Sequence, residues 1–136
     1  MATTKENKYI EAVGRRKTAT ARVRITPSSK MTYSVNDKPL ADYFKTVELQ
    51  KVITDVFAKG KIEDKFTVTA VVTGGGFAGQ AAAVRHGISR ALVELNQEVK
   101  GDLKKLGYLK RDPRSKERRK AGMAGKARKR KQWSKR

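Results

Sequence analysis

The last 28 residues of the chain carry too much charge and too little apolar surface to join a hydrophobic core. Residues 109–136 hold 14 lysines and arginines against two acidic residues, and no apolar residues recur there at helical or strand spacing. Pro113, Gly122 and Gly125 interrupt regular structure further. We therefore expect a globular α+β body at residues 1–108 and an extended basic tail at 109–136 that is disordered when free.

The net charge of the whole chain limits its partners. The sequence has 33 lysines and arginines against 13 aspartates and glutamates, a net charge of +20. A chain with that charge repels itself unless it lies beside a polyanion, so nucleic acid is the first partner that we expect. Cysteine is absent and His86 is the single histidine, so we expect no disulfide, no metal site and no cofactor.

We also expect no association with a membrane. No apolar run approaches the roughly 20 residues that a membrane-spanning helix needs, and the first residues lack the apolar stretch of a secretory signal. The basic tail has no apolar face, which argues against a membrane-active peptide. A cytoplasm-like compartment is compatible with the absence of cysteine.

Alternating side chains predict four strands in the body. Residues 18–25 alternate strictly between apolar and polar side chains, which is typical of a half-buried strand. The inward face of this strand would be Ala19, Ala21, Val23 and Ile25. Three further strands are expected at 9–13, 31–35 and 66–72, with a basic turn at 14–17 and a second turn at Asn36-Asp37.

Two amphipathic helices are predicted to cover one face of the sheet. The first begins after Thr46 as a possible N-cap and ends at Gly60, with an apolar stripe of Leu49, Val52, Ile53, Val56 and Phe57. The second runs from about 77 to 96 and contains Gly87, which costs about 1 kcal/mol against alanine unless something must approach closely there. A short helical piece follows at 101–109. The order β-β-β-α-β-α predicts a two-layer α+β sandwich with a four-stranded sheet.

The segment GGGFAG at 74–79 contains Gly74, Gly76 and Gly79 at the G-x-G-x-x-G spacing and lies between a predicted strand and a predicted helix. We reject a dinucleotide site, because too little chain follows to build a second βαβ unit and no acidic residue ends such a strand. Two interpretations remain open. The glycine amides and the helix N-terminus, with Arg85 and His86 nearby, hold a phosphate of RNA, or the segment is only a tight turn.

Nothing in the sequence predicts an enzyme or a small-molecule substrate. His86 has no second histidine and no carboxylate at helical spacing, so we expect a polar contact to RNA or solvent rather than acid–base catalysis. The carboxylates of the body are scattered and form no evident pair.

Two basic segments are candidates for RNA contact. The segment GRRKTATARVR at 14–24 has five cations, and Arg22 and Arg24 would lie about 6.5–7 Å apart on one side of a strand, close to phosphate spacing. A solubilising surface is the alternative. The tail could reach roughly 90–100 Å when extended, and Trp133 could stack on a base for about 1–3 kcal/mol. A nuclear localisation signal or a nonspecific arm are the alternatives there.

Four motifs together resemble a known family. GRRKTATARVR, GGGFAGQAAAVRHGISRAL, YLKRDPRSKERRKAG and the final QWSKR are similar, in the same order, to the bacterial type of small-subunit ribosomal protein S-nine. The resemblance implies the fold of the second domain of ribosomal protein S-five, a four-stranded sheet with helices on one side and a left-handed βαβ crossover.

The resemblance also implies a function and partners. Members of that family are structural proteins in the head of the small ribosomal subunit, on the 3′ major domain of the small-subunit rRNA, beside other head proteins. Their tails lead toward the peptidyl site. By resemblance, the tRNA-binding residues are Ser134, Lys135 and Arg136.

The motifs and the resemblance together give a set of candidate rRNA-binding residues. In the body they are Arg15, Arg16, Lys17, Arg22, Arg24, Gly74, Gly75, Gly76, Gln80, Arg85, His86 and Arg90. In the tail they are Arg111, Arg114, Arg118, Arg119, Lys120, Lys126, Arg128, Lys129 and Arg130. Two rival functions remain, a general nucleic-acid-binding basic protein and a nucleotide-dependent enzyme that uses GGGFAG.

Overall fold

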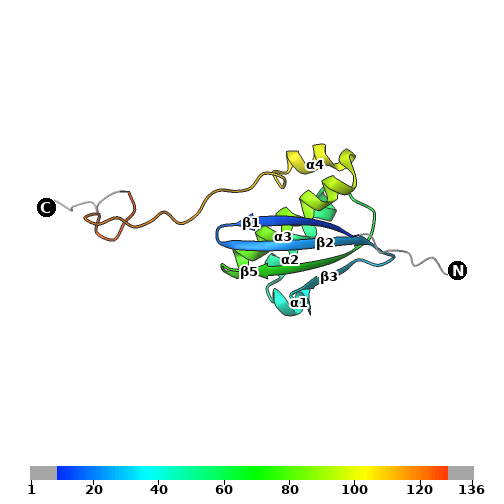
Figure 1. The fold of residues 1–136 in the computed structure, drawn as a ribbon, viewed down its shortest axis with the longest axis horizontal. Coiled ribbons are helices and arrows are strands. Elements are labelled where there is room, and N and C mark those ends of the chain that lie inside the picture. The colour runs from blue at the N-terminus through cyan, green and yellow to red at the C-terminus, as the bar shows by residue number, and fades with distance from the viewer. Residues whose placement is uncertain (1–8, 129–136) are drawn as a thin grey trace.

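A computed structural model describes residues 9–128 of the 136-residue chain. Its strands are β1 (Ile10–Arg16), β2 (Ala19–Pro27), β3 (Thr32–Val35), β4 (Lys38–Pro39) and β5 (Phe66–Thr73). Its helices are α1 (Leu40–Tyr43), α2 (Val47–Lys59), α3 (Phe77–Leu95), a 3-10 turn η1 (Gln97–Val99) and α4 (Lys100–Lys105). The tail runs away from this body on one side (Figure 1).

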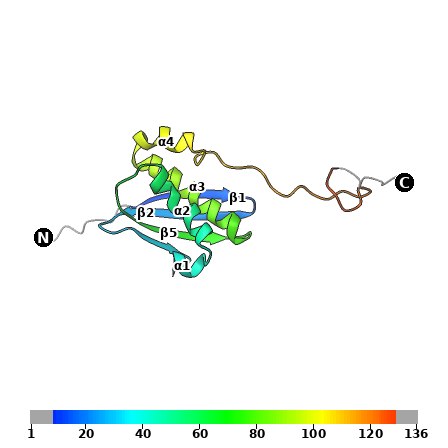
Figure 2. The same ribbon diagram turned by 180° about the vertical axis from the view of Figure 1, so that it is seen from behind.

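The five strands form one sheet in the order β1-β2-β5-β3-β4. Neighbouring strands are antiparallel except for β3 and β5, which are parallel. Helices α2 and α3 lie on the same face of this sheet, as Figures 1 and 2 show from its two sides. The chain passes from β3 through α2 to its parallel neighbour β5, so this crossover lies on the face of the sheet that the helices cover (Figure 2).

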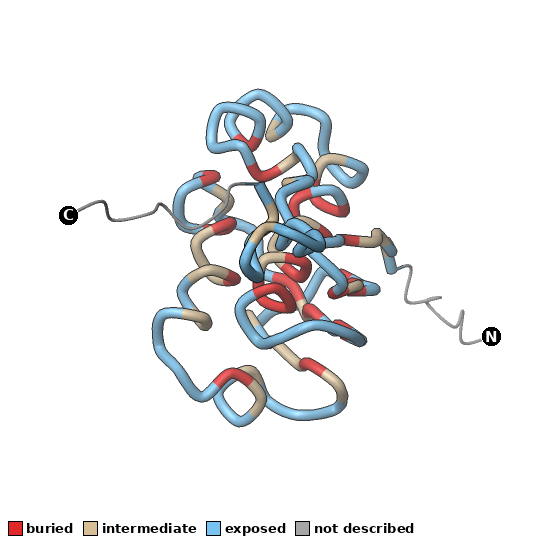
Figure 3. Tube along the Cα trace, turned by 90° about the vertical axis from the view of Figure 1, so that its left-hand side faces the viewer, coloured by how far each residue is buried: buried red, intermediate tan, exposed pale blue. Residues whose placement is uncertain are grey.

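The alternation along β2 creates the core. Ala19, Ala21, Val23 and Ile25 are fully buried, as the sequence predicts, whereas Arg22 and Arg24 are exposed. The buried residues of the strands and helices belong to one core cluster, and Figure 3 colours them red along the trace of the chain. They include Phe44 from the segment before α2 and Leu103 from α4. The other face of the sheet is left open and presents threonine and arginine side chains.

The structure corrects the predicted sheet in two places. The sheet has a fifth strand, β4, because Asn36 and Asp37 take positive φ angles of 49° and 63° and turn the chain back for one short antiparallel pairing. The segment 14–17 is not a turn. Gly14, Arg15 and Arg16 continue β1, and the hairpin closes over two residues, Lys17 and Thr18.

The predicted helices are largely confirmed. The first begins at Val47, with Thr46 in an extended N-cap position whose side chain makes no capping hydrogen bond, and ends before Gly60. The second ends at Leu95, close to its expected limit. The predicted piece at 101–109 forms helix only to Lys105, and the short helix α1 was not foreseen.

Candidate nucleic-acid interface

Arg22 and Arg24 project from β2 on the open face of the sheet. Both face Glu11 of the neighbouring strand β1, whose carboxylate oxygens lie 3.8 Å from Nε of Arg22 and 3.0 Å from Nε of Arg24. The guanidinium of Arg24 also lies 4.6 Å from the centre of the Tyr9 ring. One carboxylate against two guanidiniums leaves an excess of positive charge, so this face can still receive a phosphate.

The glycine loop between β5 and α3 lies beside the β1–β2 turn. Gly74 and Gly75 take positive φ angles of 75° and 67°, and a β-carbon on Gly74 would come within 2.6 Å of the carbonyl oxygen of Thr18. These two glycines thus meet the demands of a tight turn. Gly76, the N-cap residue of α3, differs because it is exposed and a β-carbon there would meet nothing within 4 Å.

Gln80 has a structural task. Its side chain is buried, donates from Nε2 to the carbonyl oxygen of Gly74 at 3.1 Å, and accepts at Oε1 from the Tyr43 hydroxyl at 2.7 Å. Both ends of the amide are therefore used within the protein. For this reason we leave Gln80 out of the RNA-binding surface proposed below.

His86 of α3 contacts both β1 and the start of the tail. Its Nδ1 accepts the backbone N–H of Arg15 at 3.4 Å, and its Nε2 lies 3.2 Å from the carbonyl oxygen of Leu109. This arrangement suits a neutral ring with its proton on Nε2. Burial lowers the pKa of His86 below its usual 6.5, and the nearby arginines lower it further, while the bond to Leu109 opposes both.

The start of the tail, residues 108–114, is held against the body, and we call it the tail base. Tyr108 is buried, and the guanidinium of Arg85 lies 4.8 Å from the centre of its ring. Asp112 pairs with Arg16 of β1 and receives hydrogen bonds from Nε, Nη2 and the backbone N–H of Arg114. These bonds from Arg114, together with Arg16, hold the pKa of Asp112 far below its usual range.

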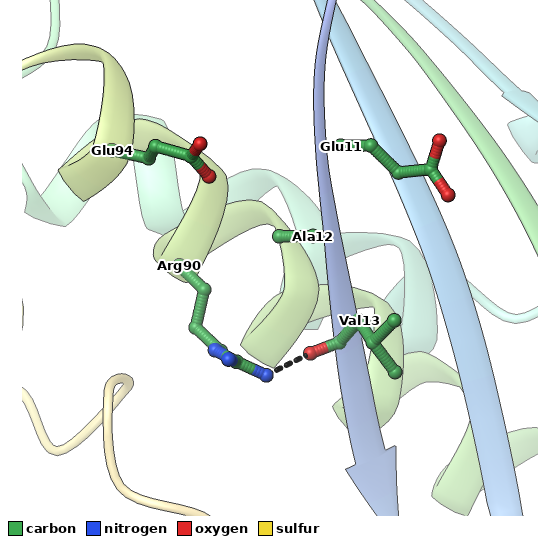
Figure 4. A pocket seen from close by; sticks show the side chains of 5 residues that line it. All are labelled: Glu11, Ala12, Val13, Arg90 and Glu94. Carbon is green, nitrogen blue, oxygen red and sulfur yellow. Dashed lines mark hydrogen bonds between the residues drawn. The ribbon is translucent and has the colours of Figure 1, made fainter.

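Arg90 closes the outer edge of the sheet against α3. Its Nη1 donates to the carbonyl oxygen of Val13 at 2.6 Å, as the dashed line in Figure 4 marks. The adjacent hollow also contains Glu11 and Glu94. The Glu11 side chain points away from Arg90 (Figure 4) and pairs with Arg22 and Arg24, so Glu94 is the acid that makes this hollow a poor place for a phosphate.

The far part of the described tail folds into a loop of its own. Glu117 pairs with Arg128 at 2.6 Å and with Lys120 at 3.8 Å. The backbone N–H of Lys120 donates to the carbonyl oxygen of Lys126 at 3.2 Å. The guanidiniums of Arg111, Arg118 and Arg119 belong to exposed residues. The predicted contacts of Lys129, Arg130, Ser134, Lys135 and Arg136 lie outside the described residues.

The fold brings several of the candidate cations to one end of the sheet. Arg16 and Lys17 at the β1–β2 turn lie beside Arg85 of α3 and Arg114 of the tail base, around one shared hollow. Arg22 and Arg24 stand apart from this group, on the open face of the sheet. The cations of the far tail form a third group.

Sequence reasoning missed Asp112 as the residue that holds the tail base. Two features of the sequence could have indicated this role. Asp-Pro marks a turn, and an acidic residue among many basic residues is able to pair with several of them. The half-buried Leu49 and Val52, predicted as core, also line the hollow beside Arg16. No sequence pattern marks that difference.

Two other features are absent from residues 9–128. In that range no three histidine, cysteine or carboxylate side chains come together as they would to hold a metal ion. No helix within those residues has the length and apolar character to cross a membrane. All buried side-chain polar atoms of the described part have a hydrogen-bond partner.

Comparisons with known proteins give the family. A profile described as "Ribosomal protein S9/S16" matches residues 14–136. The chain is 49% identical over 125 residues to "Small ribosomal subunit protein uS9" of Lawsonia intracellularis (strain PHE/MN1-00), an alignment that covers 92% of this chain and 95% of the relative. The four sequence motifs and these two matches agree: the chain belongs to the ribosomal protein S9/S16 family.

Proposed function

We propose that this chain is a structural component of the small ribosomal subunit, without enzymatic activity, and that it works in translation in a bacterial cytoplasm or a bacterial-type organelle. Family membership and the name of its relative support this assignment. We further propose that it lies in the head of the subunit, on the 3′ major domain of the rRNA and beside other head proteins.

The body anchors the chain on rRNA. The observation that carries this part is the meeting of cations from separate segments at one end of the sheet, where Arg16, Lys17, Arg85 and Arg114 surround one hollow. Arg22 and Arg24 offer a second contact surface on the open sheet face. Guanidinium groups in such numbers match phosphates without reading sequence.

The tail reaches from that anchor to the tRNA in the peptidyl site. Arg16, Arg85 and His86 fix the tail base to β1 and α3, so the rest of the tail starts from a fixed point and direction. A cationic tip neutralises tRNA phosphate whatever the tRNA sequence, which suits a site that receives every tRNA. We assign this contact to Ser134, Lys135 and Arg136.

Deleting Ser134–Arg136 tests the tRNA part of this proposal. Small subunits that carry the shortened chain should assemble normally and hold peptidyl-site tRNA more weakly. An unchanged tRNA affinity in those subunits would contradict the proposed contact between the tail and peptidyl-site tRNA. The full-length Gln132→Ala variant, which keeps Ser134, Lys135 and Arg136, is the matched control and should bind tRNA as the parent does.

The rival function is a general nucleic-acid-binding basic protein. Such a protein would bind DNA and RNA comparably and would not need a tail base that is fixed to the body. Recovery in a fixed ratio to one particle distinguishes the two, because a general binder distributes over all nucleic acid.

A further inference from the structure

A hollow of about 290 Å³ opens between α2, α3, the β1–β2 turn and the tail base. Its floor is apolar. It consists of Leu49 and Val52 from α2 and of Ala78, Gly79 and Ala82 from α3. Its rim is charged, and consists of Arg16, Lys17, Arg85, Asp112 and Arg114.

The floor is a part of the core that no element covers. On the apolar stripe of α2, Ile53, Val56 and Phe57 are buried under the sheet, but Leu49 and Val52 are only half-buried. The stripe thus continues past the end of the core and into the hollow. Apolar surface that is ringed by charge in this way is typical of a binding site rather than of a free surface.

The rim has more positive than negative charge. Four of its side chains are cations, and its single acid, Asp112, is already paired with Arg16 and Arg114. The guanidinium of Arg85 is held against the ring of Tyr108 at 4.8 Å, so it faces the hollow from a fixed position. An anionic group could therefore be received at the rim without breaking the pairs that hold the tail base.

Two other hollows of the described surface lack this combination. The one beside Arg90 contains Glu11 and Glu94. The one on the open sheet face has Arg22 and Arg24 but also Asp37, and the rest of its lining is Ser34, Thr69, Ala70 and Val71, with no large aliphatic pair like Leu49 and Val52. An apolar floor beneath an excess of cations occurs at the hollow between α2 and α3.

We propose that this hollow holds one nucleotide of the rRNA that is turned out of its stack, with the base on the apolar floor and a phosphate at the cationic rim. This inference rests on the proposed function and specifies the RNA that the body recognises. RNA is commonly read through such unstacked bases, which stack on aromatic rings or on arginine guanidinium planes, and three arginines, Arg16, Arg85 and Arg114, line this hollow. A volume of about 290 Å³ lies at the small end for ligand pockets, which favours a single nucleotide over a peptide strand.

The test fills the hollow without changing its charge. The full-length Ala82→Leu variant adds apolar volume at the floor, and Ala58→Leu adds the same volume at an exposed position of α2 as the matched control. Each purified chain is titrated onto small-subunit particles reconstituted without this protein. We expect Ala82→Leu to bind about tenfold more weakly than the parent, with an unchanged dependence of affinity on salt because no phosphate contact is lost.

Chemical probing of the bound particles identifies the occupant. Reagents that modify base edges should find one rRNA base protected by the parent and by Ala58→Leu, and reactive with Ala82→Leu. Because Ala82 is half-buried, Ala78→Leu at an exposed position provides the same test if the first variant does not fold.

Three results would overturn the proposal, and they are distinguishable. Equal affinity and equal base reactivity for all chains would show that the hollow holds no part of the rRNA. Weaker binding with no base made reactive would indicate a segment of a neighbouring protein as the occupant. If the parent chain itself does not bind the particles, the proposed function fails, and this inference fails with it.

Discussion

Gly14 of β1 and Gly87 of α3 lie in direct contact. A β-carbon on Gly14 would come within 2.4 Å of the backbone nitrogen of Gly87 and within 1.8 Å of the carbonyl oxygen of Ala83. A β-carbon on Gly87 would in turn lie 2.6 Å from Cγ2 of Val23. The helix therefore rests on the sheet backbone itself, which explains a glycine in the middle of a helix and confirms the close approach that Gly87 predicts.

The substitution Gly14→Ala should destabilise the body by about 3 kcal/mol, because an added methyl group meets backbone atoms that cannot turn away. Urea unfolding, followed by far-ultraviolet circular dichroism, measures the change in the free energy of unfolding.

The control for this prediction is Gly101→Ala in α4, where a β-carbon would meet nothing within 4 Å. That change should raise the free energy of unfolding by up to about 1 kcal/mol, through helix propensity alone. If both variants behave alike, the close contact of α3 with β1 is wrong.

The stability of the body should fall as the pH is lowered from about 7.5 to about 5.5. His86 has a lowered pKa in the folded chain, so the unfolded chain takes up the proton first. Protonation then lowers the free energy of the unfolded state relative to the folded state. This effect begins as the pH falls to the usual pKa of 6.5 and continues until the pH reaches the lowered pKa of the folded chain. The free energy of unfolding in urea, measured across this range, gives the slope.

The matched variant for that measurement is His86→Gln, which keeps a polar side chain of similar reach but does not titrate. Its stability should depend less on pH over the same range. Parallel pH curves for the parent and the variant would contradict the neutral state of this half-buried ring.

The substitution Asp112→Asn should loosen the tail base while leaving the body folded. It removes the charge that holds Arg16 and Arg114 together. Amide hydrogen exchange in residues 108–114 should speed up by several-fold or more, whereas exchange in β2 should stay as it is.

Glu117→Gln is the control for this effect, since it also removes an acid from the tail but one that pairs with Arg128, away from the body. Faster exchange at the tail base in Glu117→Gln, or unchanged exchange in Asp112→Asn, would show that the base is held by something other than Asp112.

Replacing Arg22 and Arg24 together by glutamine should reduce incorporation into the small subunit to below about half of the parent level, through lost phosphate contacts. Glutamine is preferable to glutamate, which would place new acids against Glu11. Quantitative mass spectrometry of purified subunits measures the copies per particle. The control is the double variant of Lys45 and Lys51 to glutamine, which makes the same change in charge at other exposed positions and should be incorporated normally. Normal incorporation of the Arg22/Arg24 variant would show that the open sheet face does not contribute to rRNA binding.

Local patterns predicted most of the fold. The alternation of Ala19, Ala21, Val23 and Ile25 gave the core face of β2, and the stripe on α2 gave its buried side, because both depend on burial that repeats with the local period. The wrong turn at 14–17 has a tertiary cause. Gly14 reads as a turn residue locally, but it lies in a strand because α3 packs against it.

The candidate site was less predictable from sequence. The sequence identified which cationic residues are candidates for RNA contact, but not how they are arranged in space. Their grouping around one hollow depends on the path of the tail past β1, which no local pattern encodes. The same holds for Leu49, which continues an apolar stripe in sequence and yet lies at the edge of the core, beside Arg16.

The most direct test of the central claim is sedimentation of a cell lysate through a sucrose gradient, with the chain followed by mass spectrometry at moderate and at high salt. The account predicts that the chain sediments with the small ribosomal subunit, in one copy for each particle, and stays there through a high-salt wash because many contacts hold it. A chain that spreads over all nucleic acid and washes off at high salt would contradict the account and favour a general basic binder.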